Sequence, residues 1–172
     1  MKTLLCWLLW LTATSSVIRA NEAPLVTEGT VNAPVADVWA LWTTSAGLRS
    51  WMAPLADIDL RIGGLMRVQY DPKGVLGDAK TVENRVLAYE PGRMLAIQVT
   101  KAPDDFPFRA SVGSMWTVLT FTPDGDGRTH LRIVGLGIGS DEPSKKMRSF
   151  FAQGNAYTLQ LLQKRFSPPQ TP

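Results

Sequence analysis

The sequence predicts an α+β fold in which a curved antiparallel sheet of about six or seven strands wraps around a long C-terminal helix. Three observations lead to this prediction. The segment 140–166 carries apolar residues at three- and four-residue spacing, which is typical of a helix buried on one side. Between 57 and 137, short alternating stretches are separated by turn residues, which favours hairpins and an antiparallel sheet. Such a sheet needs an apolar cover on one face, and the C-terminal helix is the only long candidate.

In the N-terminal part of the domain, the sequence predicts one strand followed by two short helices. A strand over 25–31 ends at Asn32-Ala33-Pro34, and apolar residues then recur at helical spacing from Val35 to Trp42. The run Thr43-Thr44-Ser45 offers a break and a new N-cap for a second helix that ends at Trp51.

Three hairpins are predicted next. The first joins a strand over 57–62 to one over 66–70 through Gly63-Gly64, with Met66, Val68 and Tyr70 on one face. The second joins 80–89 to 94–100, and the third joins 114–122 to 128–137. Between the last two hairpins, the segment 102–113 is expected to be a mobile loop because it contains prolines and aspartates.

Residues 1–20 are predicted to be a secretory signal peptide. Lys2 precedes the apolar run 4–11, which is too short to span a bilayer, and Ile18 and Ala20 suit a cleavage site after Ala20. The alternative is a retained N-terminal anchor. We expect an exported protein, periplasmic or secreted, with a domain over 21–166 and a disordered tail over 167–172.

Charge and cysteine content exclude several functions for such a mature chain. Cleavage removes Lys2 and Arg19 but no acidic residue, so the formal net charge falls from +3 to +1. It also removes Cys6, the only cysteine, and with it any disulfide or cysteine metal site. The sequence has no basic run interleaved with aromatic residues, the pattern that would indicate nucleic-acid binding. We expect no cofactor and no stable membrane span after cleavage.

The sequence offers no convincing catalytic or metal-binding residue. His130 is the only histidine, and without a carboxylate pair or cysteine nearby it makes neither a zinc site nor a triad. The glycines at 63–64 and 135–139 lack the lysine and spacing of a phosphate loop, so we interpret them as turns.

Several motifs, in this order and spacing, resemble the START-like helix-grip (SRPBCC) superfamily. The similarity is greatest to the branch named after the activator of heat-shock-protein-ninety ATPase homologue, which is also grouped with polyketide cyclase-like proteins. The motifs are Val31-Asn32-Ala33-Pro34-Val35-Ala36-Asp37-Val38-Trp39-Ala40-Leu41, Leu48-Arg49-Ser50-Trp51, Gly63-Gly64, Tyr89-Glu90-Pro91-Gly92-Arg93-Met94-Leu95, Gly127-Arg128-Thr129-His130-Leu131 and Phe151-Ala152-Gln153-Gly154-Asn155.

The resemblance implies a cavity between the sheet and the long helix for a small hydrophobic or amphipathic ligand, without implying catalysis. Methionines and aromatics suit such a pocket, and Phe106 and Phe108 would form an apolar lid over it. Asn155, Tyr70 and Arg67 could bind a polar ligand group. The candidate ligand-binding residues are Trp42, Trp51, Met66, Tyr70, Phe106, Phe108, Met115, Met147, Phe151, Gly154, Asn155 and Tyr157.

Within the C-terminal helix, the residues near its start are expected to face the ligand and those near its end to pack on the sheet. Met147, Phe151, Gly154 and Tyr157 belong to the first group, and Leu161, Leu162 and Phe166 to the second. Gly154 costs helix stability, which suggests a close approach or space left open. We assign Trp39 and Phe150 to the core.

Our leading hypothesis is an exported, non-enzymatic binding protein. The first alternative is an enzyme of the cyclase, aromatase or hydrolase kind that uses the same cavity, with Tyr70 or Asn155 moving protons. The second alternative is a chaperone-regulating interaction module, which export of the chain would argue against.

Overall fold

The computed structural model describes residues 23–167. The predicted signal peptide, and the predicted tail beyond Ser167, lie outside these residues. Seven antiparallel strands form one sheet in the order β1-β7-β6-β5-β4-β3-β2, which confirms the predicted fold class. The strands are β1 (Leu25–Val31), β2 (Leu55–Ile58), β3 (Leu65–Gln69), β4 (Val82–Glu90), β5 (Met94–Lys101), β6 (Trp116–Pro123) and β7 (Thr129–Leu136).

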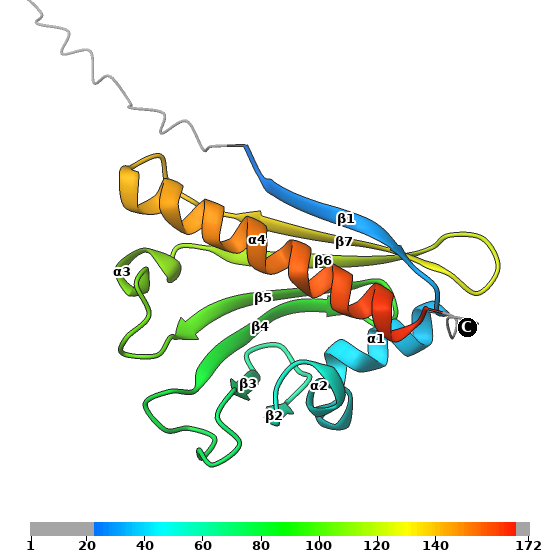
Figure 1. Cartoon of the computed structure of the whole chain (residues 1–172), viewed down its shortest axis with the longest axis horizontal. Helices are drawn as coiled ribbons and strands as arrows, with labels where there is room; N and C mark the ends of the chain where they lie inside the picture. The colour runs from blue at the N-terminus through cyan, green and yellow to red at the C-terminus, as the bar shows by residue number, and fades with distance from the viewer. Residues whose placement is uncertain (1–22, 168–172) are drawn as a thin grey trace, which may run out of the picture.

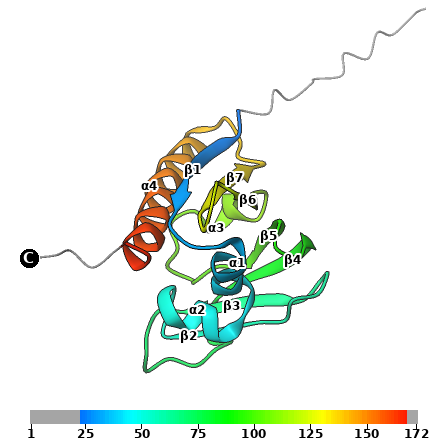
Figure 2. The ribbon, with the colours of Figure 1, turned by 90° about the vertical axis from the view of Figure 1, so that its right-hand side faces the viewer.

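Four helices accompany the sheet within the described residues: α1 (Val35–Thr43), α2 (Ser45–Trp51), α3 (Arg109–Val112) and α4 (Glu142–Arg165). Helix α4 lies along the β1 side of the curved sheet, and α1 and α2 lie towards the β2 side (Figures 1 and 2). No helix between residues 23 and 167 combines the length and apolar character needed to cross a membrane.

Two helices, α4 and α2, begin at side-chain caps, and the second confirms the N-cap predicted within Thr43-Thr44-Ser45. The side chain of Asp141 accepts a hydrogen bond from the backbone N–H of Ser144 at 2.9 Å, and Pro143 occupies the first turn of α4. Thr44 caps α2 in the same way, accepting from the N–H of Gly47 at 2.9 Å. Each cap satisfies a donor that the helix itself leaves unpaired.

Helix α4 approaches β1 closely because β1 carries a glycine at the contact. A Cβ atom added at Gly29 would lie 2.9 Å from Cδ2 of Leu159, which is closer than side chains pack. Polar bonds fix the same alignment: Gln163 Nε2 donates to the carbonyl oxygen of Thr30 at 3.1 Å, and Arg148 Nη2 donates to that of Pro24 at 3.1 Å.

Two local predictions were wrong. The strand predicted over 57–62 runs instead over Leu55–Ile58, because residues 59–64 form a tight turn in which Arg61 N–H donates to the carbonyl oxygen of Asp59 at 2.8 Å. Ile62 is consequently 71% exposed. The predicted loop 102–113 contains the short helix α3, which its prolines concealed.

The inner face of α4 also differs from the prediction. The face turned to the sheet carries Ser144, Met147, Leu159 and Leu162 as buried residues, with Phe151 and Asn155 half-buried between them. Gly154 is exposed, and a Cβ atom added to it would have no other atom within 4 Å, while Tyr157 is 62% exposed. Both therefore lie on the solvent side.

The two aromatic residues predicted to belong to the core differ in their burial. The prediction is wrong in part for Phe150, which is 47% exposed. Trp39 is half-buried and packs against the core, with its ring at a centroid distance of 5.3 Å from that of Phe121.

Candidate ligand site

The concave face of the sheet is apolar, and its buried side chains divide into two groups. The larger group, here called the main cluster, gathers around α1, α2 and the C-terminal half of α4 and includes Val38, Trp42, Met66, Leu119, Leu159 and Leu162. The smaller group, here called the end cluster, lies at the N-terminal end of α4 and contains Leu25, Ala102, Val112, Met115, Ile138 and Met147.

The predicted ligand-binding residues separate into these two groups instead of forming one continuous lining. Trp42 and Met66 are buried in the main cluster, and Trp51 packs against it with its ring 5.1 Å from that of Trp42. The end cluster holds Met115 and Met147, with Phe106, Phe108 and Phe151 packed against it.

Four predicted polar or pocket residues lie elsewhere. Tyr70 follows the last residue of β3 and is 61% exposed, and partial desolvation raises the pKa of its phenol. Gly154 and Tyr157 lie on the exposed side of α4. Arg67 points to the outer face of the sheet, where its guanidinium pairs with Asp57, so it does not face the interior.

Four phenylalanine rings close the end cluster. Phe106 lies 5.7 Å from Phe108, 5.6 Å from Phe150 and 6.4 Å from Phe151, all with steeply inclined ring planes. Such edge-to-face pairs add about 0.5–1.5 kcal/mol each beyond the area that they bury. This Phe cluster joins the segment before α3 to the first half of α4.

A small cavity opens beside the end cluster. It has a volume of about 190 Å³ and lies between β5 and α3, lined by Val99, Thr100, Lys101, Ala102, Arg109, Val112 and Gly113. Pockets for drug-sized ligands span roughly 300–1,000 Å³, so a ligand of that size would require α3 to move outwards.

Two buried N–H donors in the interior have no hydrogen-bond partner among the described residues. They are Nε1 of Trp42, a residue 6% exposed, and Nδ2 of Asn155. Asn155 stands one helical turn from Phe151 at the end cluster and one turn from Leu159 in the main cluster. Its amide therefore lies where the two clusters meet.

The described residues offer little acid–base chemistry in the interior. Buried polar residues are Thr43, Gln69, Thr81, Thr129 and Ser144, none of which titrates near neutral pH. His130 lies on the outer face, its Nε2 3.9 Å from a carboxylate oxygen of Glu28. Residues 23–167 contain no group of three or more histidine, cysteine or acidic side chains that could hold a metal.

Sequence reasoning missed the contribution of α3 and its surroundings to the site. Val99, Val112 and Ile138 belong to the end cluster or pack on it. The strand that carries Val99 was predicted, but only the three-dimensional approach of α3 to α4 brings these side chains together. Gly29 did carry a signal, since a glycine inside a strand often marks a close backbone approach.

The sheet order, the helix pair after β1 and the C-terminal helix on the concave face define a START-like protein of the helix-grip class. Within that class, the chain belongs to the family described as Activator of Hsp90 ATPase homolog 1-like protein, whose model matches residues 32–167. This match confirms the resemblance identified from the motifs. No curated protein matches the sequence significantly.

Solved structures share the fold at low sequence identity. Protein MLL2253 from Mesorhizobium loti matches with a TM-score of 0.64 and 21% identity over 83% of this chain and 95% of its own. The Aha1 dimer from Colwellia psychrerythraea matches with a TM-score of 0.64 and 13% identity over 87% of this chain and 99% of its own. CalU16 from Micromonospora echinospora matches with a TM-score of 0.57 and 22% identity over 83% of this chain and 75% of its own.

Proposed function

We propose that the chain is an exported, non-enzymatic protein that holds a small hydrophobic or amphipathic molecule between the sheet and α4. The observation that carries this proposal is the pair of buried N–H donors without a described partner, Nε1 of Trp42 and Nδ2 of Asn155, beside the two apolar clusters. The family fold supports it, since START-like domains use this space for ligands.

Unpartnered buried donors are costly in a protein without a ligand. Each costs about 1–3 kcal/mol, because the group has lost its bonds to water and gained none in return. A ligand oxygen that accepts a hydrogen bond from one of these donors would recover that free energy. The proposed ligand is therefore mainly apolar and carries at least one hydroxyl, carbonyl or carboxylate oxygen.

The end cluster is the proposed opening. Helix α3 has only four residues, and the Phe cluster attaches its segment to α4 through side-chain contacts. Outward movement of this segment would enlarge the cavity of about 190 Å³ and expose the interior around Met115 and Met147.

The cyclase alternative needs a polar group that moves protons inside the site. Of its two candidates, Tyr70 is 61% exposed beyond the end of β3, and Asn155 has a neutral amide. No observation in residues 23–167 favours this alternative. The chaperone-regulating alternative rests on the family description, and export of the chain would separate it from a cytosolic chaperone.

Native mass spectrometry and organic extraction of freshly purified protein test the proposal. We expect a bound apolar species in the wild-type protein and several-fold less of it in Trp42→Phe, because the substitution removes an N–H donor worth about 1 kcal/mol. Trp39→Phe is the matched control, since Trp39 also packs on the main cluster. It should retain the wild-type amount.

Two outcomes would contradict the proposal. One is a protein that carries no bound species after purification and takes none up from a mixture of fatty acids, sterols and phospholipids. The other is an equal loss of bound species in both tryptophan variants, which would remove the role assigned to Trp42.

Export is tested separately by the mass of the protein recovered from its producing cells. Cleavage after Ala20 gives a chain that starts at Asn21 and lacks Cys6. Recovery of a chain that still contains Cys6 would refute the predicted cleavage without bearing on ligand binding.

A further inference from the structure

A second depression lies outside the ligand site, at the end of the sheet formed by β2, β3 and the start of β4. Its volume is about 650 Å³, within the range of small-molecule pockets. Leu65 and Arg67 of β3 line it, and both alternate with the buried Met66 and Val68, so they point to the outer face of the sheet. These two side chains therefore lie on the opposite face of the sheet from the apolar interior, and the depression is here called the outer pocket. Ile58 of β2 forms part of its edge and also packs on the main cluster.

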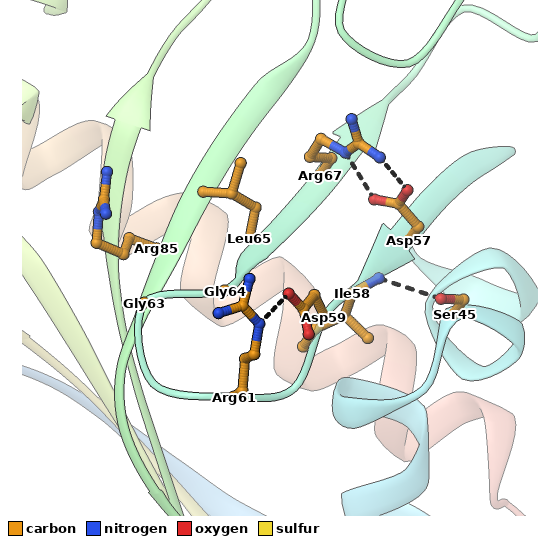
Figure 3. Close-up of a pocket in the computed structure, with 10 residues that line it drawn as sticks. All are labelled: Ser45, Asp57, Ile58, Asp59, Arg61, Gly63, Gly64, Leu65, Arg67 and Arg85. Atoms are coloured by element: carbon orange, nitrogen blue, oxygen red, sulfur yellow. Dashed lines mark hydrogen bonds and ion pairs between the residues drawn. The ribbon is translucent and has the colours of Figure 1, made fainter.

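Three guanidinium groups surround the outer pocket. Arg61 comes from the turn between β2 and β3, Arg67 from β3 and Arg85 from β4. Figure 3 shows Leu65 between Arg85 and Arg67, with Arg61 rising from the turn below them. Arginine is suited to binding planar oxyanions, because its fork of N–H donors matches a carboxylate or phosphate.

Two of the arginines are held in place by aspartates. Arg67 Nε donates to Asp57 Oδ1 at 2.9 Å and its Nη2 donates to the other oxygen, while Arg61 Nε donates to Asp59 Oδ2 at 2.6 Å. These bonds use two of the five N–H groups of Arg67 and one of those of Arg61. The remaining N–H groups are available to a ligand.

Arg85 differs from the other two because nothing in residues 23–167 pairs with it. Its side chain is exposed and makes no hydrogen bond or ion pair with a described residue. Leu65 lies directly opposite it on β3, in register. Arg85 therefore presents an uncompensated charge beside a partly apolar surface.

The charges around the outer pocket leave a positive excess. Three arginines and two aspartates line it, which gives +1. Glu83 lies opposite Arg67 in the strand register, and its carboxylate is 3.8 Å from Nζ of Lys101, which balances it. An oxyanion at Arg85 would thus meet a net attraction, although Asp57 and Asp59 limit its approach to the Arg85 side.

The turn that positions Asp59 and Arg61 depends on glycine. Gly63 has a φ of +81°, and a Cβ atom at Gly64 would lie 2.1 Å from the carbonyl oxygen of Asp59. The backbone bonds from Gly63 N–H to Val86 O and from Val86 N–H to Gly64 O fix this turn against β4, at 2.8 and 2.9 Å. The turn that carries Asp59 and Arg61 is thereby joined to β4, the strand that carries Arg85.

We propose that the outer pocket binds a small molecule through its carboxylate or phosphate group, with Arg85 as the principal contact and Arg61 and Arg67 as additional donors. The site is separate from the interior, so it does not depend on the proposed carrier function. The depression of about 650 Å³ also leaves space over Leu65 for an organic part beside the oxyanion.

Titration of ¹⁵N-labelled protein with inorganic phosphate and, separately, with succinate at constant ionic strength tests the proposal. We expect saturable shifts of the amide signals of Gly63, Gly64 and Leu65 with at least one of these anions. Saturation by phosphate alone identifies a phosphate ligand, and saturation by succinate identifies a carboxylate. Sedimentation with phosphatidylglycerol vesicles that depends on Arg85 would assign the phosphate to a lipid headgroup.

Variants of Arg85 give the decisive comparison. Arg85→Gln should weaken anion binding about tenfold, since it removes a charged hydrogen-bond donor. The affinity of Arg85→Lys should lie between those of wild type and Arg85→Gln, because lysine keeps the charge but lacks the paired N–H donors of a guanidinium. Lys146→Gln removes the same charge from an exposed position on α4 and should bind as the wild type does. Both Arg85 variants should keep the wild-type melting temperature, since Arg85 has no described partner to lose.

The proposal is overturned by any of three results. These are shifts that do not saturate with either anion, equal affinity of wild type and Arg85→Gln, or an equal loss in Lys146→Gln, which would indicate only a general charge effect.

Discussion

At the scale of single residues, Gly29 determines how closely α4 can pack on the sheet. Its missing side chain leaves room for Leu159, whose Cδ2 would be only 2.9 Å from a Cβ atom. Nε2 of Gln163 would lie 3.2 Å from the same added Cβ atom, so it too would have to move. A larger residue at position 29 must therefore displace side chains that bind α4 to β1.

We predict that Gly29→Val lowers the free energy of unfolding by about 1–3 kcal/mol, the usual cost of overpacking a core contact. Urea unfolding of the purified variant measures this. Leu159→Ala in the same chain should relieve part of the strain, so the double variant should lose less than the sum of the two single losses. Strict additivity would show that the two side chains do not compete for space.

Asp78 organises the loop between β3 and β4. Its carboxylate accepts from Val75 N–H at 3.1 Å, Lys80 N–H at 2.9 Å, Thr81 Oγ1 at 3.2 Å and Gln69 Nε2 at 2.6 Å. The bond from Val75 N–H does most to lower the pKa of Asp78 below its ordinary value of 3.8. Desolvation is the next largest effect and opposes it, and the bonds from Lys80, Thr81 and Gln69 add to the lowering.

This shift predicts a pH-dependent difference between wild type and Asp78→Asn. Because the folded state has the lower pKa, the stabilisation by Asp78 is present above pH 3.8 and is lost as the pH falls through the folded value. Wild type should therefore be the more stable protein at pH 7, and the gap should narrow towards pH 2. Urea unfolding at both pH values measures it, with Asp126→Asn in the exposed hairpin loop as control. A gap that stays constant with pH would refute the assignment.

At the scale of elements, α4 explains why the sequence predicted the helix but not its inner face. The helix is marked by its cap at Asp141 and by apolar residues at helical spacing. Two stripes, however, run along it side by side: the observed inner one through Met147, Phe151 and Leu159, and an outer one through Phe150, Gly154 and Tyr157. Periodicity is equally good for both, so it cannot decide between them. The choice depends on where Gly29 of β1 receives Leu159, a contact between segments far apart in the sequence.

The sheet was predicted more accurately than the site for a related reason. Hairpin signals are local, and the strand over Leu25–Val31 and the hairpin around Pro91-Gly92 were placed to within a residue or two of the observed bounds. The outer pocket has no local signal, because Arg61, Arg67 and Arg85 converge only once β4 is in register with β3.

The solvent position of Gly154 leads to a prediction about α4 itself. Beyond its chain neighbours and the backbone of α4 itself, an added methyl group at this position has no atom within 4 Å. We therefore expect Gly154→Ala to stabilise the protein by about 0.5–1 kcal/mol through helix propensity. Ala156→Gly, also at an exposed position of α4, should destabilise it by a similar amount. Thermal unfolding of both variants gives the answer, and a loss of stability in Gly154→Ala would mean that the glycine packs against something after all.

At the scale of the whole molecule, the two apolar clusters form an interior in which two buried N–H donors lack a described hydrogen-bond partner. The clusters meet at α4, where the half-buried Asn155 places a buried amide nitrogen without a described partner between Phe151 and Leu159. A purely structural interior would favour an apolar residue at this point. The retained amide is consistent with a protein that reaches its lowest free energy only when a ligand is bound.

The substitution Asn155→Leu distinguishes a purely structural interior from one that binds a ligand through Asn155. Without ligand, the variant should be more stable than wild type by about 1–3 kcal/mol, because it removes an unsatisfied buried group. Wild-type protein saturated with its ligand at a hundred times Kd should gain about 2.7 kcal/mol, and the variant, having lost a hydrogen bond to the ligand, should gain less. Delipidated samples of both proteins, unfolded in urea with and without the extracted ligand, measure all four values. A variant that is stabilised without ligand and still shows the full wild-type gain would mean that Asn155 is a flaw in the core and no part of the ligand site.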